Sequence, residues 1–291
     1  MLREMNILII GGDDRYIEVI RILTARKANV YLSGYDKLTE KTDGIHIRLE
    51  DAAFSKFDAL LLPVSGTKGD GEIELAPFSS RGLKLTEAMI EKTPEHCTIY
   101  TGISNRFLDG LADRTGRKLI RLFERDDIAV LNSIPTAEGT LSLAMNETNT
   151  MIHGSNVVVL GFGRVGMTVA RIFSAVGAHV SVAARKTSDL ARIKEMGLHP
   201  IRLDELGGTV SGYEVFINTI PALILDKMAL KAIKKSSLII DLASAPGGVD
   251  FNAAEALGIN AIHALGLPGK VAPISAGKII GNVLVDLMIK K

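Results

Sequence analysis

The sequence predicts an α/β protein with two doubly wound parallel sheets, one in each half of the chain. Short apolar runs alternate with segments whose apolar residues recur at helical spacing. Continuous apolar runs are typical of strands buried on both faces of a parallel sheet. Of the 291 residues, 47% are hydrophobic and 23% are charged, which excludes a disordered chain, a coiled coil and a collagen-like repeat. This length is typical of about two domains.

The first half begins with a strand at Met5–Ile10, which ends at a pair of glycines and precedes a helical pattern over Tyr16–Leu23. Further strands are predicted at Asn29–Leu32, Ala59–Pro63, Thr98–Thr101 and Lys118–Leu122, and helices at Thr86–Glu91 and Asn105–Arg114. The glycine-rich loop Ser65–Gly71 follows one of these strands. Ligands bind at the carboxyl ends of strands in open α/β sheets, so this loop either lines a ligand site or is a flexible connection.

A long helix is predicted to join the two halves over residues 134–153, with Ser133 as its cap and Pro135 near its first turn. We predict a first, flavodoxin-like or Rossmann-like domain over residues 1–133 and 274–291, and a second domain over residues 154–273. The final helix, Ser275–Ile289, is expected to cross back to the first domain.

The second half contains a glycine motif in a strand–turn–helix context. The predicted strand Asn156–Leu160 runs directly into Gly161-Phe162-Gly163-Arg164-Val165-Gly166, and a helix follows over Met167–Val176. In a dinucleotide-binding Rossmann domain, the first glycine allows the tight turn, the second lets the backbone approach a pyrophosphate, and the third lets helix and strand pack. The helix N-terminus then attracts the phosphates. The alternative is a tight turn with no ligand.

The end of the next strand, His179–Ala183, indicates which dinucleotide binds. NAD sites place an acidic residue there to bind the ribose hydroxyls. This sequence has Ala184, Arg185 and Lys186 instead. A guanidinium pairs well with a 2′-phosphate, so the pattern favours NADP over NAD, unless both cations are merely solvated. The missing acid also argues against an S-adenosylmethionine methyltransferase.

Two later loops are expected to lie beside the nicotinamide, because both follow strands of the second sheet. The strands are Glu214–Asn218 and Ser237–Asp241, and a last one is predicted at Ala261–His263. The candidate loop residues are Thr219, Ile220 and Pro221 after the first strand, and Leu242, Ala243 and Ser244 after the second. Asp241 is interpreted as a helix cap or interior acceptor rather than a catalytic group.

The spacing of reactive residues identifies no catalytic set. None of the six histidines forms a pair with metal-ligand spacing, so no metal site is predicted, and no Gly-x-Ser-x-Gly nucleophile motif occurs. The single cysteine, Cys97, excludes an internal disulfide and is interpreted as a buried small residue. His263 is a weak candidate for a catalytic base, and the alternative is a structural role. Lys270 is a candidate to bind a substrate carboxylate, and the alternative is a solvated lysine.

Charge and hydropathy argue against a nucleic-acid-binding protein and against a membrane-spanning protein. The net charge is +1, with 19 Lys and Arg against 23 Asp and Glu in residues 1–150, and 15 against 10 in residues 151–291. This is not the basic footprint of a nucleic-acid-binding protein. The apolar stretch Tyr213–Leu225 is short and contains Glu214 and Pro221, so no membrane span is predicted. The first residues do not resemble a signal peptide, and we expect a cytoplasmic protein.

Over nearly its whole length the sequence resembles the A subunits of dipicolinate synthases from spore-forming bacteria. The segments that carry the resemblance are ILIIGGDDR (Ile7–Arg15), LPVSGTKGDG (Leu62–Gly71), NSIPTAEGTL (Asn132–Leu141), VVLGFGRVGMTVAR (Val158–Arg171), DLASAPGGVDF (Asp241–Phe251) and LPGKVAPISAGKII (Leu267–Ile280). The GFGRVG segment occurs in many dehydrogenases, whereas the ordered set is much more specific. The layout is also similar, more distantly, to alanine dehydrogenases and D-2-hydroxyacid dehydrogenases.

The resemblance implies a sporulation enzyme of the mother-cell cytoplasm that oxidises a dihydrodipicolinate-type intermediate from the lysine pathway to pyridine-2,6-dicarboxylate, with NADP as cofactor. It also implies a partner, the flavoprotein-like B subunit, and we expect a homo-oligomer. The dicarboxylate substrate is expected between the domains, at Ser65, Gly66, Thr67, Thr136, Lys270 and Ser275. The alternatives are an NADP-binding regulatory or scaffold subunit without its own turnover, and an amino- or hydroxy-acid dehydrogenase.

Overall fold

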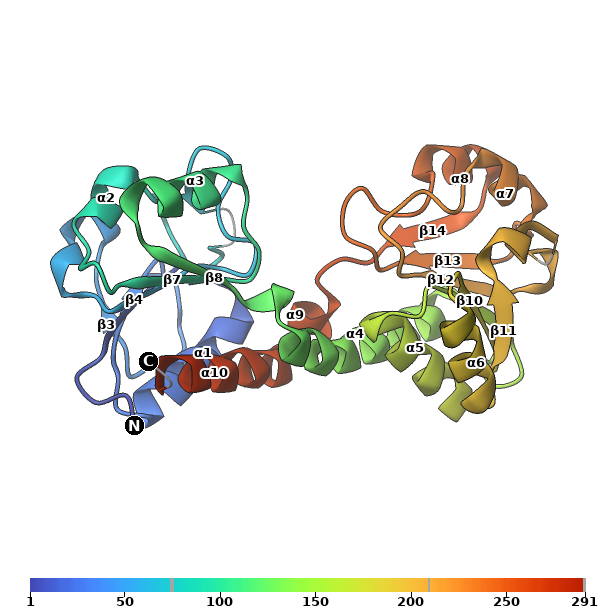
Figure 1. The fold of residues 1–291 in the computed structure, drawn as a ribbon, viewed down its shortest axis with the longest axis horizontal. Coiled ribbons are helices and arrows are strands. Elements are labelled where there is room, and N and C mark those ends of the chain that lie inside the picture. The colour runs from blue at the N-terminus through green and yellow to red at the C-terminus, as the bar shows by residue number, and fades with distance from the viewer. Residues whose placement is uncertain (74–75, 209, 290–291) are drawn as a thin grey trace. The chain divides into compact units, whose positions relative to one another are not determined.

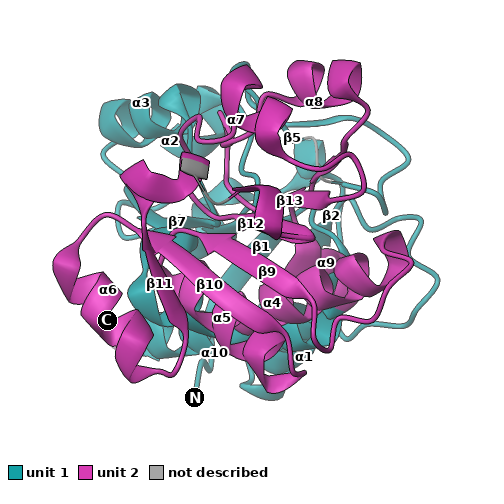
Figure 2. Cartoon of the chain, turned by 90° about the vertical axis from the view of Figure 1, so that its right-hand side faces the viewer, with its two compact units in different colours: residues 1–131, 272–291 teal, residues 132–271 magenta. Residues whose placement is uncertain are grey.

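Two six-stranded parallel sheets, each with helices on both faces, form the computed structural model, which describes residues 1–73, 76–208 and 210–289 (Figure 1). The sheet orders are β3-β2-β1-β4-β7-β8 and β11-β10-β9-β12-β13-β14. Both therefore have the doubly wound order in which the chain reverses direction beside the first strand, and the predicted fold class is confirmed. The chain divides into unit 1, residues 1–131 and 272–291, and unit 2, residues 132–271 (Figure 2).

Unit 1 contains the first sheet, a small antiparallel pair of strands and the helices that flank the sheet. Its elements are β1 (Asn6–Ile10), α1 (Asp14–Ala25), β2 (Asn29–Ser33), β3 (Ile45–His46), β4 (Ala59–Leu61), β5 (Glu72–Ile73), β6 (Leu83–Lys84), α2 (Glu87–Glu91), β7 (Thr98–Thr101), α3 (Arg106–Thr115), β8 (Lys118–Arg121) and α10 (Pro273–Ile289). Short 3₁₀ turns occupy Leu49–Asp51, Phe54–Lys56 and Leu122–Glu124.

Unit 2 contains the second sheet, and α4 (Asp126–Glu147) enters it from unit 1. Its other elements are β9 (Asn156–Leu160), α5 (Arg164–Ala175), β10 (His179–Ala184), α6 (Thr187–Glu195), β11 (His199–Arg202), β12 (Val215–Asn218), α7 (Lys227–Ala232), β13 (Leu238–Asp241), α8 (Phe251–Leu257), β14 (Asn260–His263) and α9 (Leu267–Val271). Short 3₁₀ turns occupy Leu203–Gly208 and Val210–Gly212.

Each sheet separates two apolar cores because successive side chains of a strand point to opposite faces. In β1, Ile7 and Ile9 belong to the core under α1 and α10, while Leu8 and Ile10 belong to the core under α2 and α3 (Figure 1). In unit 2, α4, α5 and α6 cover one face, and α7 and α8 cover the other. Burial on both faces explains why these strands are continuous apolar runs in the sequence.

The last helix packs against the first helix of unit 1, as predicted. A β-carbon on Gly277 of α10 would lie 2.3 Å from the Arg15 carbonyl oxygen of α1, and one on Gly281 would lie 2.8 Å from Ile22. Ile280 and Leu284 enter the core that contains Tyr16. The small residues on α10 therefore allow the close approach of the two helices.

The prediction for the long helix is wrong at both ends. Helix α4 begins at Asp126 rather than beside Ser133, and it ends at Glu147 rather than near residue 153. Pro135 lies inside the helix, although proline usually marks a first turn. The division between the units falls between Leu131 and Asn132, within α4. Among the described residues, no helix is long and apolar enough to cross a membrane.

Candidate nucleotide-binding site

The loop between β9 and α5 has no room for side chains at its first and third glycines. Gly161 has a φ of +99°, a conformation that L side chains rarely adopt, and a β-carbon there would lie 2.5 Å from Thr219 Oγ1. A β-carbon on Gly166 would lie 2.2 Å from the Gly161 carbonyl oxygen. Both positions therefore exclude any larger residue, because the helix packs directly on the turn.

The second glycine is different, because it faces open space. Gly163 is the N-cap of α5, has an ordinary extended backbone, and makes no side-chain capping bond. A β-carbon there would meet no atom within 4 Å among the described residues. The N–H groups of a helix's first turn lack partners within the helix and attract anions. Gly163 thus leaves the N-terminus of α5 open to a ligand, although the fold would tolerate a side chain.

A cavity of about 550 Å³ adjoins this loop at the carboxyl ends of β9, β10 and β12. Its lining includes ten of the fourteen residues predicted to bind the cofactor. These ten are Gly161, Gly163, Arg164, Val165, Ala184, Arg185, Lys186, Thr219, Ile220 and Pro221; Phe162, Ala183, Asp189 and Leu203 complete the lining. Gly166, Leu242, Ala243 and Ser244 do not line it. Gly166 lies beneath the turn, and the other three follow β13, the next strand of the sheet.

Exposed cations lie at the end of β10. Arg185 and Lys186 directly follow the strand and both are exposed, so their assignment to a 2′-phosphate stays a prediction. A second cavity of about 450 Å³ is lined by Arg185, Arg202, Leu203 and Asp204. The two cavities share Arg185 and Leu203, so the pocket with the two arginines adjoins the cavity beside the loop Gly161–Gly166.

Arg202 is a residue of this pocket that sequence reasoning missed. It is the last residue of β11 and lies opposite Ala184 in the parallel register. Its guanidinium donates to both carboxylate oxygens of Asp204, at 3.2 and 3.0 Å, and this bond lowers the pKa of the Asp204 carboxyl. Neither β11 nor its pairing was predicted. The one sequence feature that could have pointed to Arg202 is its place directly after the apolar pair Pro200-Ile201, where a short strand could end.

The loops after β12 and β13 are tied together by a buried carboxylate. Asp241 is fully buried and accepts hydrogen bonds from Asn218 Nδ2 at 2.7 Å, from Ala243 N at 3.0 Å and from Gly248 N at 2.8 Å. Asn218 Oδ1 in turn accepts from Ile220 N at 3.1 Å. Asp241 is therefore an interior acceptor, one of the two roles expected of it. Asn218 was not predicted, and only the pairing of β12 with β13 brings it beside Asp241.

His263, the weak catalytic candidate, is exposed at the end of β14 and makes two contacts. Its Nε2 lies 3.0 Å from the Ala243 carbonyl oxygen, and its ring centroid lies 5.4 Å from that of Phe251. A carbonyl oxygen is only an acceptor, so Nε2 carries the proton in this contact, and Nδ1 is then the basic nitrogen. His263 thus positions the loop after β13, and a role as base stays a prediction.

The six predicted substrate residues are divided between the units. Gly66 and Thr67 are buried and Ser65 is exposed, in the loop after β4 of unit 1; Ser275 is exposed in the first turn of α10. Thr67 is 7% exposed, and its hydroxyl has no partner among the described residues. In unit 2, Lys270 is exposed in α9, and the Thr136 hydroxyl donates to the Asn132 carbonyl at 2.8 Å. Thr136 is therefore left as an acceptor rather than a donor.

Unit 1 holds a partly buried ion pair that sequence reasoning missed. Arg15, at the start of α1, is 6% exposed and binds both carboxylate oxygens of Asp13, with Nη2–Oδ2 at 2.6 Å and Nε–Oδ1 at 2.9 Å. The pair follows β1, whose neighbour β4 precedes the loop that contains Thr67. Tyr16 supports this end of the sheet by donating from its hydroxyl to the Leu62 carbonyl at 2.6 Å.

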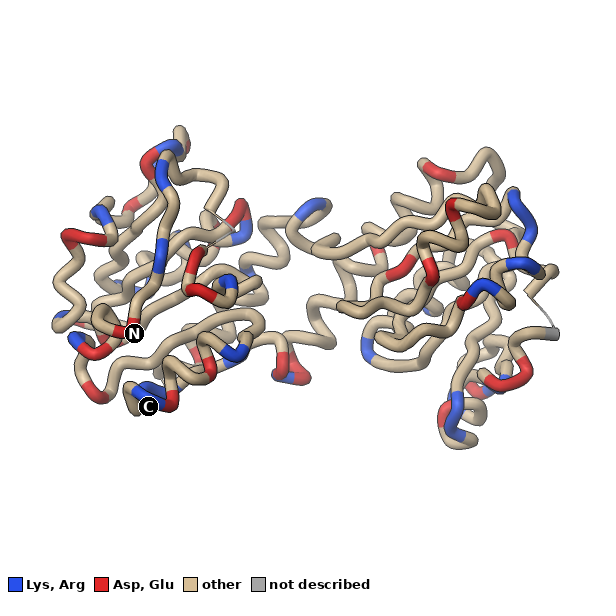
Figure 3. The backbone as a smooth tube through the Cα atoms, turned by 90° about the horizontal axis from the view of Figure 1, so that it is seen from above, with Lys and Arg blue, Asp and Glu red and all other residues tan. Residues whose placement is uncertain are grey.

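Over the described residues, cationic and anionic positions are interspersed in both units (Figure 3). No group of three or more His, Cys, Asp or Glu side chains in this part of the chain is placed to hold a metal ion.

Two family models match the chain, one in each half. The model for the NAD binding domain of D-isomer specific 2-hydroxyacid dehydrogenases matches residues 135–267, and the model for the N-terminal domain of the dipicolinate synthase A subunit matches residues 6–123. The fold and the site thus define a protein of the nicotinamide-dinucleotide-dependent dehydrogenase class. A D-lactate dehydrogenase from Escherichia coli shares this fold, with a TM-score of 0.64 at 15% identity over 97% of this chain and 96% of that chain.

The relatives define the family more narrowly. The chain is 48% identical to the dipicolinate synthase A subunit of Bacillus subtilis strain 168 over 99% of this chain and 97% of that protein. Crystal structures of the same subunit from Bacillus halodurans and from Bacillus subtilis match with TM-scores of 0.96 and 0.94, both at 48% identity. They cover 99% and 100% of this chain, and 99% and 97% of those chains. The chain belongs to the family of dipicolinate synthase A subunits.

Proposed function

We propose that this chain oxidises a dihydrodipicolinate-type intermediate to pyridine-2,6-dicarboxylate, with NADP as the oxidant, in the cytoplasm of a sporulating cell. The family and the dehydrogenase domain support an oxidoreductase of dipicolinate synthesis. The single observation that carries the choice of NADP is the cationic end of β10. There, Arg185 and Lys186 stand where an NAD site has an acid, and Arg185 shares its pocket with Arg202.

The residues of unit 2 fit this cofactor. The open N-terminus of α5 at Gly163 suits a diphosphate, and the adjoining cavity of about 550 Å³ has the size of a small-molecule site. Arg185 suits a 2′-phosphate, because guanidinium groups bind phosphate oxygens in pairs. Arg202 holds Asp204 with Nε and Nη2, and its Nη1 is left to donate to the same phosphate. We assign the diphosphate to the loop Gly161–Gly166 and the 2′-phosphate to these two arginines.

The reaction removes two electrons and two protons from a ring that becomes aromatic. When bound, NADP accepts the hydride. The substrate's remaining proton leaves to a base, for which Nδ1 of His263 is the one candidate proposed. Because an aromatic product makes the step strongly downhill, the residues mainly have to hold the ring in place. Asn218 and Asp241 do this indirectly, by fixing the loops that follow β12 and β13.

For the two substrate carboxylates we propose donors in both units. Thr67 has a buried hydroxyl with no partner in the described part of unit 1, and Ser65 and Gly66 adjoin it. Lys270 is an exposed cation of unit 2. Ser275 and Thr136 stay in the proposed set, although the Thr136 hydroxyl already donates within α4.

The test of the cofactor is a charge reversal at the end of β10. Arg185→Asp removes a phosphate ligand, places a like charge against the 2′-phosphate and offers an acceptor to the ribose hydroxyls of NAD. We expect the ratio of NADP to NAD affinity to fall by about tenfold or more. The measurement is calorimetric titration of both nucleotides at one salt concentration.

Arg202→Gln tests the second arginine and should lower NADP affinity while leaving NAD affinity unchanged. Arg192→Gln is the matched control, because Arg192 is an exposed, ion-paired arginine on α6 that lines neither cavity. A wild-type protein that prefers NAD, or a ratio that Arg185→Asp leaves unchanged, would contradict the assignment.

Turnover tests the activity itself. The purified chain, supplied with NADP and the product of the dihydrodipicolinate-forming step, should release pyridine-2,6-dicarboxylate and NADPH in equal amounts. The same assay in the presence of the B subunit measures whether this proposed partner is required. NADP binding without turnover under both conditions would instead support a regulatory or scaffold role.

A further inference from the structure

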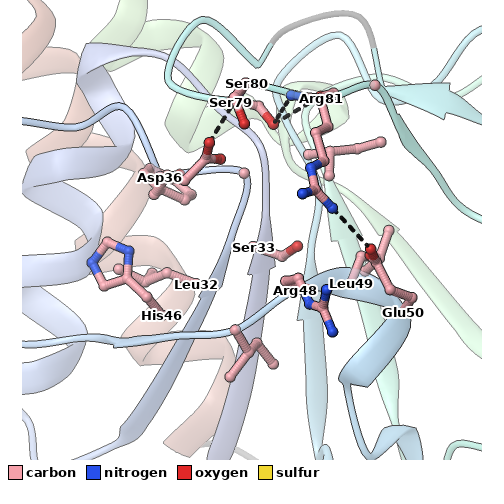
Figure 4. Close-up of a pocket in the computed structure, with 15 residues that line it drawn as sticks. Leu32, Ser33, Asp36, His46, Arg48, Leu49, Glu50, Ser79, Ser80 and Arg81 are labelled. Carbon is pink, nitrogen blue, oxygen red and sulfur yellow. Dashed lines mark hydrogen bonds and ion pairs between the residues drawn. The ribbon is translucent and has the colours of Figure 1, made fainter.

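Unit 1 contains a cavity of its own at the carboxyl end of β2. Its volume is about 290 Å³, and three segments line it: Leu32–Asp36 at the end of β2, His46–Glu50 around the end of β3, and Ser79–Leu83 ahead of and into β6 (Figure 4). None of these residues was predicted to bind a ligand. The cavity is built wholly within unit 1, so it exists independently of the nucleotide site.

The inner wall of this cavity presents an unpartnered hydroxyl. Ser33 is the last residue of β2 and is 1% exposed, and its Oγ has no hydrogen-bond partner among the described residues. In Figure 4 the hydroxyl points toward the side of the pocket where Arg48 and Arg81 lie. A buried hydroxyl without a partner is unfavourable, because it has lost its water. A ligand with an acceptor oxygen would satisfy it.

The two arginines add further donors beside this hydroxyl. Arg48 donates from Nε to Asp51 Oδ2 at 2.5 Å, and Arg81 Nη1 lies 3.7 Å from Glu50 Oε1, which is longer than a hydrogen bond. No other hydrogen bond joins either guanidinium to the described residues. Their terminal N–H groups are therefore available to an anion, and guanidinium groups bind carboxylates strongly.

The rest of the lining is apolar apart from a few polar side chains, which include the acids Asp36 and Glu50. Leu32, Ile47, Leu49 and Leu83 supply hydrocarbon surface. Asp36, the acid on the opposite wall, accepts from the Ser80 backbone N–H at 3.0 Å, which holds the loop of residues 79–83 in place. The cavity thus offers donors at Ser33, Arg48 and Arg81 and apolar surface at the leucines, of which Leu49 lies beside Arg48 (Figure 4).

A dinucleotide does not fit this place, although the strand order of unit 1 is the same as that of unit 2. In unit 1 the carboxylate of Asp13 caps α1, accepting from Arg15 N at 3.2 Å, and is bonded to the Arg15 side chain. The anion position at the helix N-terminus is therefore occupied by the protein's own acid. The Tyr16 ring also fills the space beside Gly12, where a β-carbon would lie 2.5 Å from it.

We propose that the cavity of unit 1 binds a small planar carboxylate, with its carboxylate on Ser33, Arg48 and Arg81 and its ring against the leucines. The cavity volume suits a single ring with one or two carboxylates. Pyridine-2,6-dicarboxylate belongs to this chemical class, so the site would let the proposed product bind away from the nucleotide. Binding here requires neither NADP nor turnover.

The experiment titrates the nucleotide-free full-length chain with benzoate, with pyridine-2,6-dicarboxylate and with benzamide, the neutral counterpart of benzoate. Calorimetry gives affinities, and crystals soaked with each compound give positions. We expect both carboxylates to bind in the cavity and benzamide to bind at least about tenfold more weakly, since it lacks the charge that the arginines recognise.

Two variants locate the binding. Ser33→Ala and the double variant Arg48→Gln/Arg81→Gln should each weaken both carboxylates by about tenfold or more, with unchanged melting temperatures. Arg114→Gln is the control, because Arg114 is an exposed, ion-paired arginine on α3 outside the cavity. Equal binding of benzamide, or unchanged affinity in both variants, would overturn the proposal.

Gly163→Val separates this proposal from the proposed function. That variant should lose nucleotide binding and keep carboxylate binding at the wild-type affinity. If it lost carboxylate binding instead, the ligand would belong to unit 2 and the cavity of unit 1 would not be its site. If Arg185→Asp left nucleotide preference unchanged, only the cofactor assignment would fail.

Discussion

At the scale of single residues, the three glycines of the loop between β9 and α5 have separate roles. At the first and third glycines the protein itself fills the space that a side chain would need. At the middle glycine, a β-carbon would meet no atom of the described residues within 4 Å. The middle glycine is therefore a position where binding and stability can be separated by mutation.

Gly163→Val should abolish nucleotide binding and leave the fold intact. The valine side chain would occupy the space in which we place the diphosphate, whereas no described protein atom lies within 4 Å of its β-carbon. The measurements are calorimetric titration with NADP and thermal unfolding without it. Gly166→Val is the contrasting variant: its β-carbon would lie 2.2 Å from a carbonyl oxygen, so its melting temperature should fall. Nucleotide binding by Gly163→Val at wild-type affinity would contradict the site.

Asp241→Asn should destabilise the protein by about 2 kcal/mol, because a buried carboxylate with three donors becomes an amide that donates where it should accept. Urea unfolding measures the change. Asp250→Asn is the control, since Asp250 is a half-buried helix cap whose asparagine replacement caps equally well. Equal stability of wild type and Asp241→Asn would show that the three bonds contribute nothing.

The residues that the sequence made predictable are those whose chemistry depends on immediate neighbours. The glycine loop and the cations after β10 follow from order along the chain, because strand, turn and helix are consecutive. Asn218 and Arg202 could not be found in this way. Each reaches its site through pairing with the next or preceding strand across an intervening helix, β13 for Asn218 and β10 for Arg202. Register between strands is set by tertiary packing, which local patterns do not specify.

At the scale of elements, a close helix–helix contact of unit 1 is the packing of α10 on α1. Gly277 and Gly281 lie one helical turn apart, and the β-carbon that either lacks would meet α1. Large side chains at these positions would push the two helices apart and open the core around Tyr16 and Ile280.

Gly277→Val should destabilise unit 1 by at least about 2 kcal/mol, because its β-carbon would lie 2.3 Å from the Arg15 carbonyl oxygen and 2.9 Å from Glu18 Cβ. The expected readout is a lower urea midpoint, with nucleotide affinity of unit 2 unchanged. Lys278 on the same helix is exposed, so Lys278→Ala should leave the urea midpoint unchanged. A wild-type midpoint for Gly277→Val would mean that α10 can shift at no cost.

Strands and helices in continuous apolar or periodic segments were predictable to within a few residues, as for β7, β9 and β13. The short edge strands β3 and β11 were not, because Ile45-His46 and His199–Arg202 lack an apolar run. The start of α4 was missed because Pro135 was taken as a first-turn residue. A proline removes one backbone bond, and a helix of 22 residues packed against other elements retains enough bonds to continue through it.

At the scale of the whole molecule, unit 1 carries ionisable groups that are held neutral. Tyr16 and Tyr35 are fully buried, and burial raises the pKa of each phenol above its ordinary value. Burial also raises the pKa of Tyr100 to about 12. The hydroxyls of Tyr16 and Tyr35 donate to the Leu62 and Gly11 carbonyls at 2.6 and 2.7 Å.

The free energy of unfolding should therefore fall as the pH rises above about 10. In that range the unfolded chain loses these phenolic protons while the folded chain keeps them, so the unfolded state gains stability. Below about pH 10, the stabilisation that comes from the raised pKa values of these phenols is fully present. Urea unfolding at four pH values from about 8 to about 11 measures it, and Tyr16→Phe should reduce the fall above about pH 10. An identical fall in that variant would assign the effect to other groups.

The division of unit 1 along the chain has a consequence for its synthesis. Residues 1–131 leave the ribosome long before α10, with the whole of unit 2 made in between. At ordinary translation rates the delay is roughly 10–30 s. Unit 2 is contiguous and can fold during that time, whereas the nascent sheet of unit 1 lacks the helix that covers Tyr16 and Ile20. We therefore expect unit 2 to complete its fold first, while the uncovered face of unit 1 is a target for chaperones.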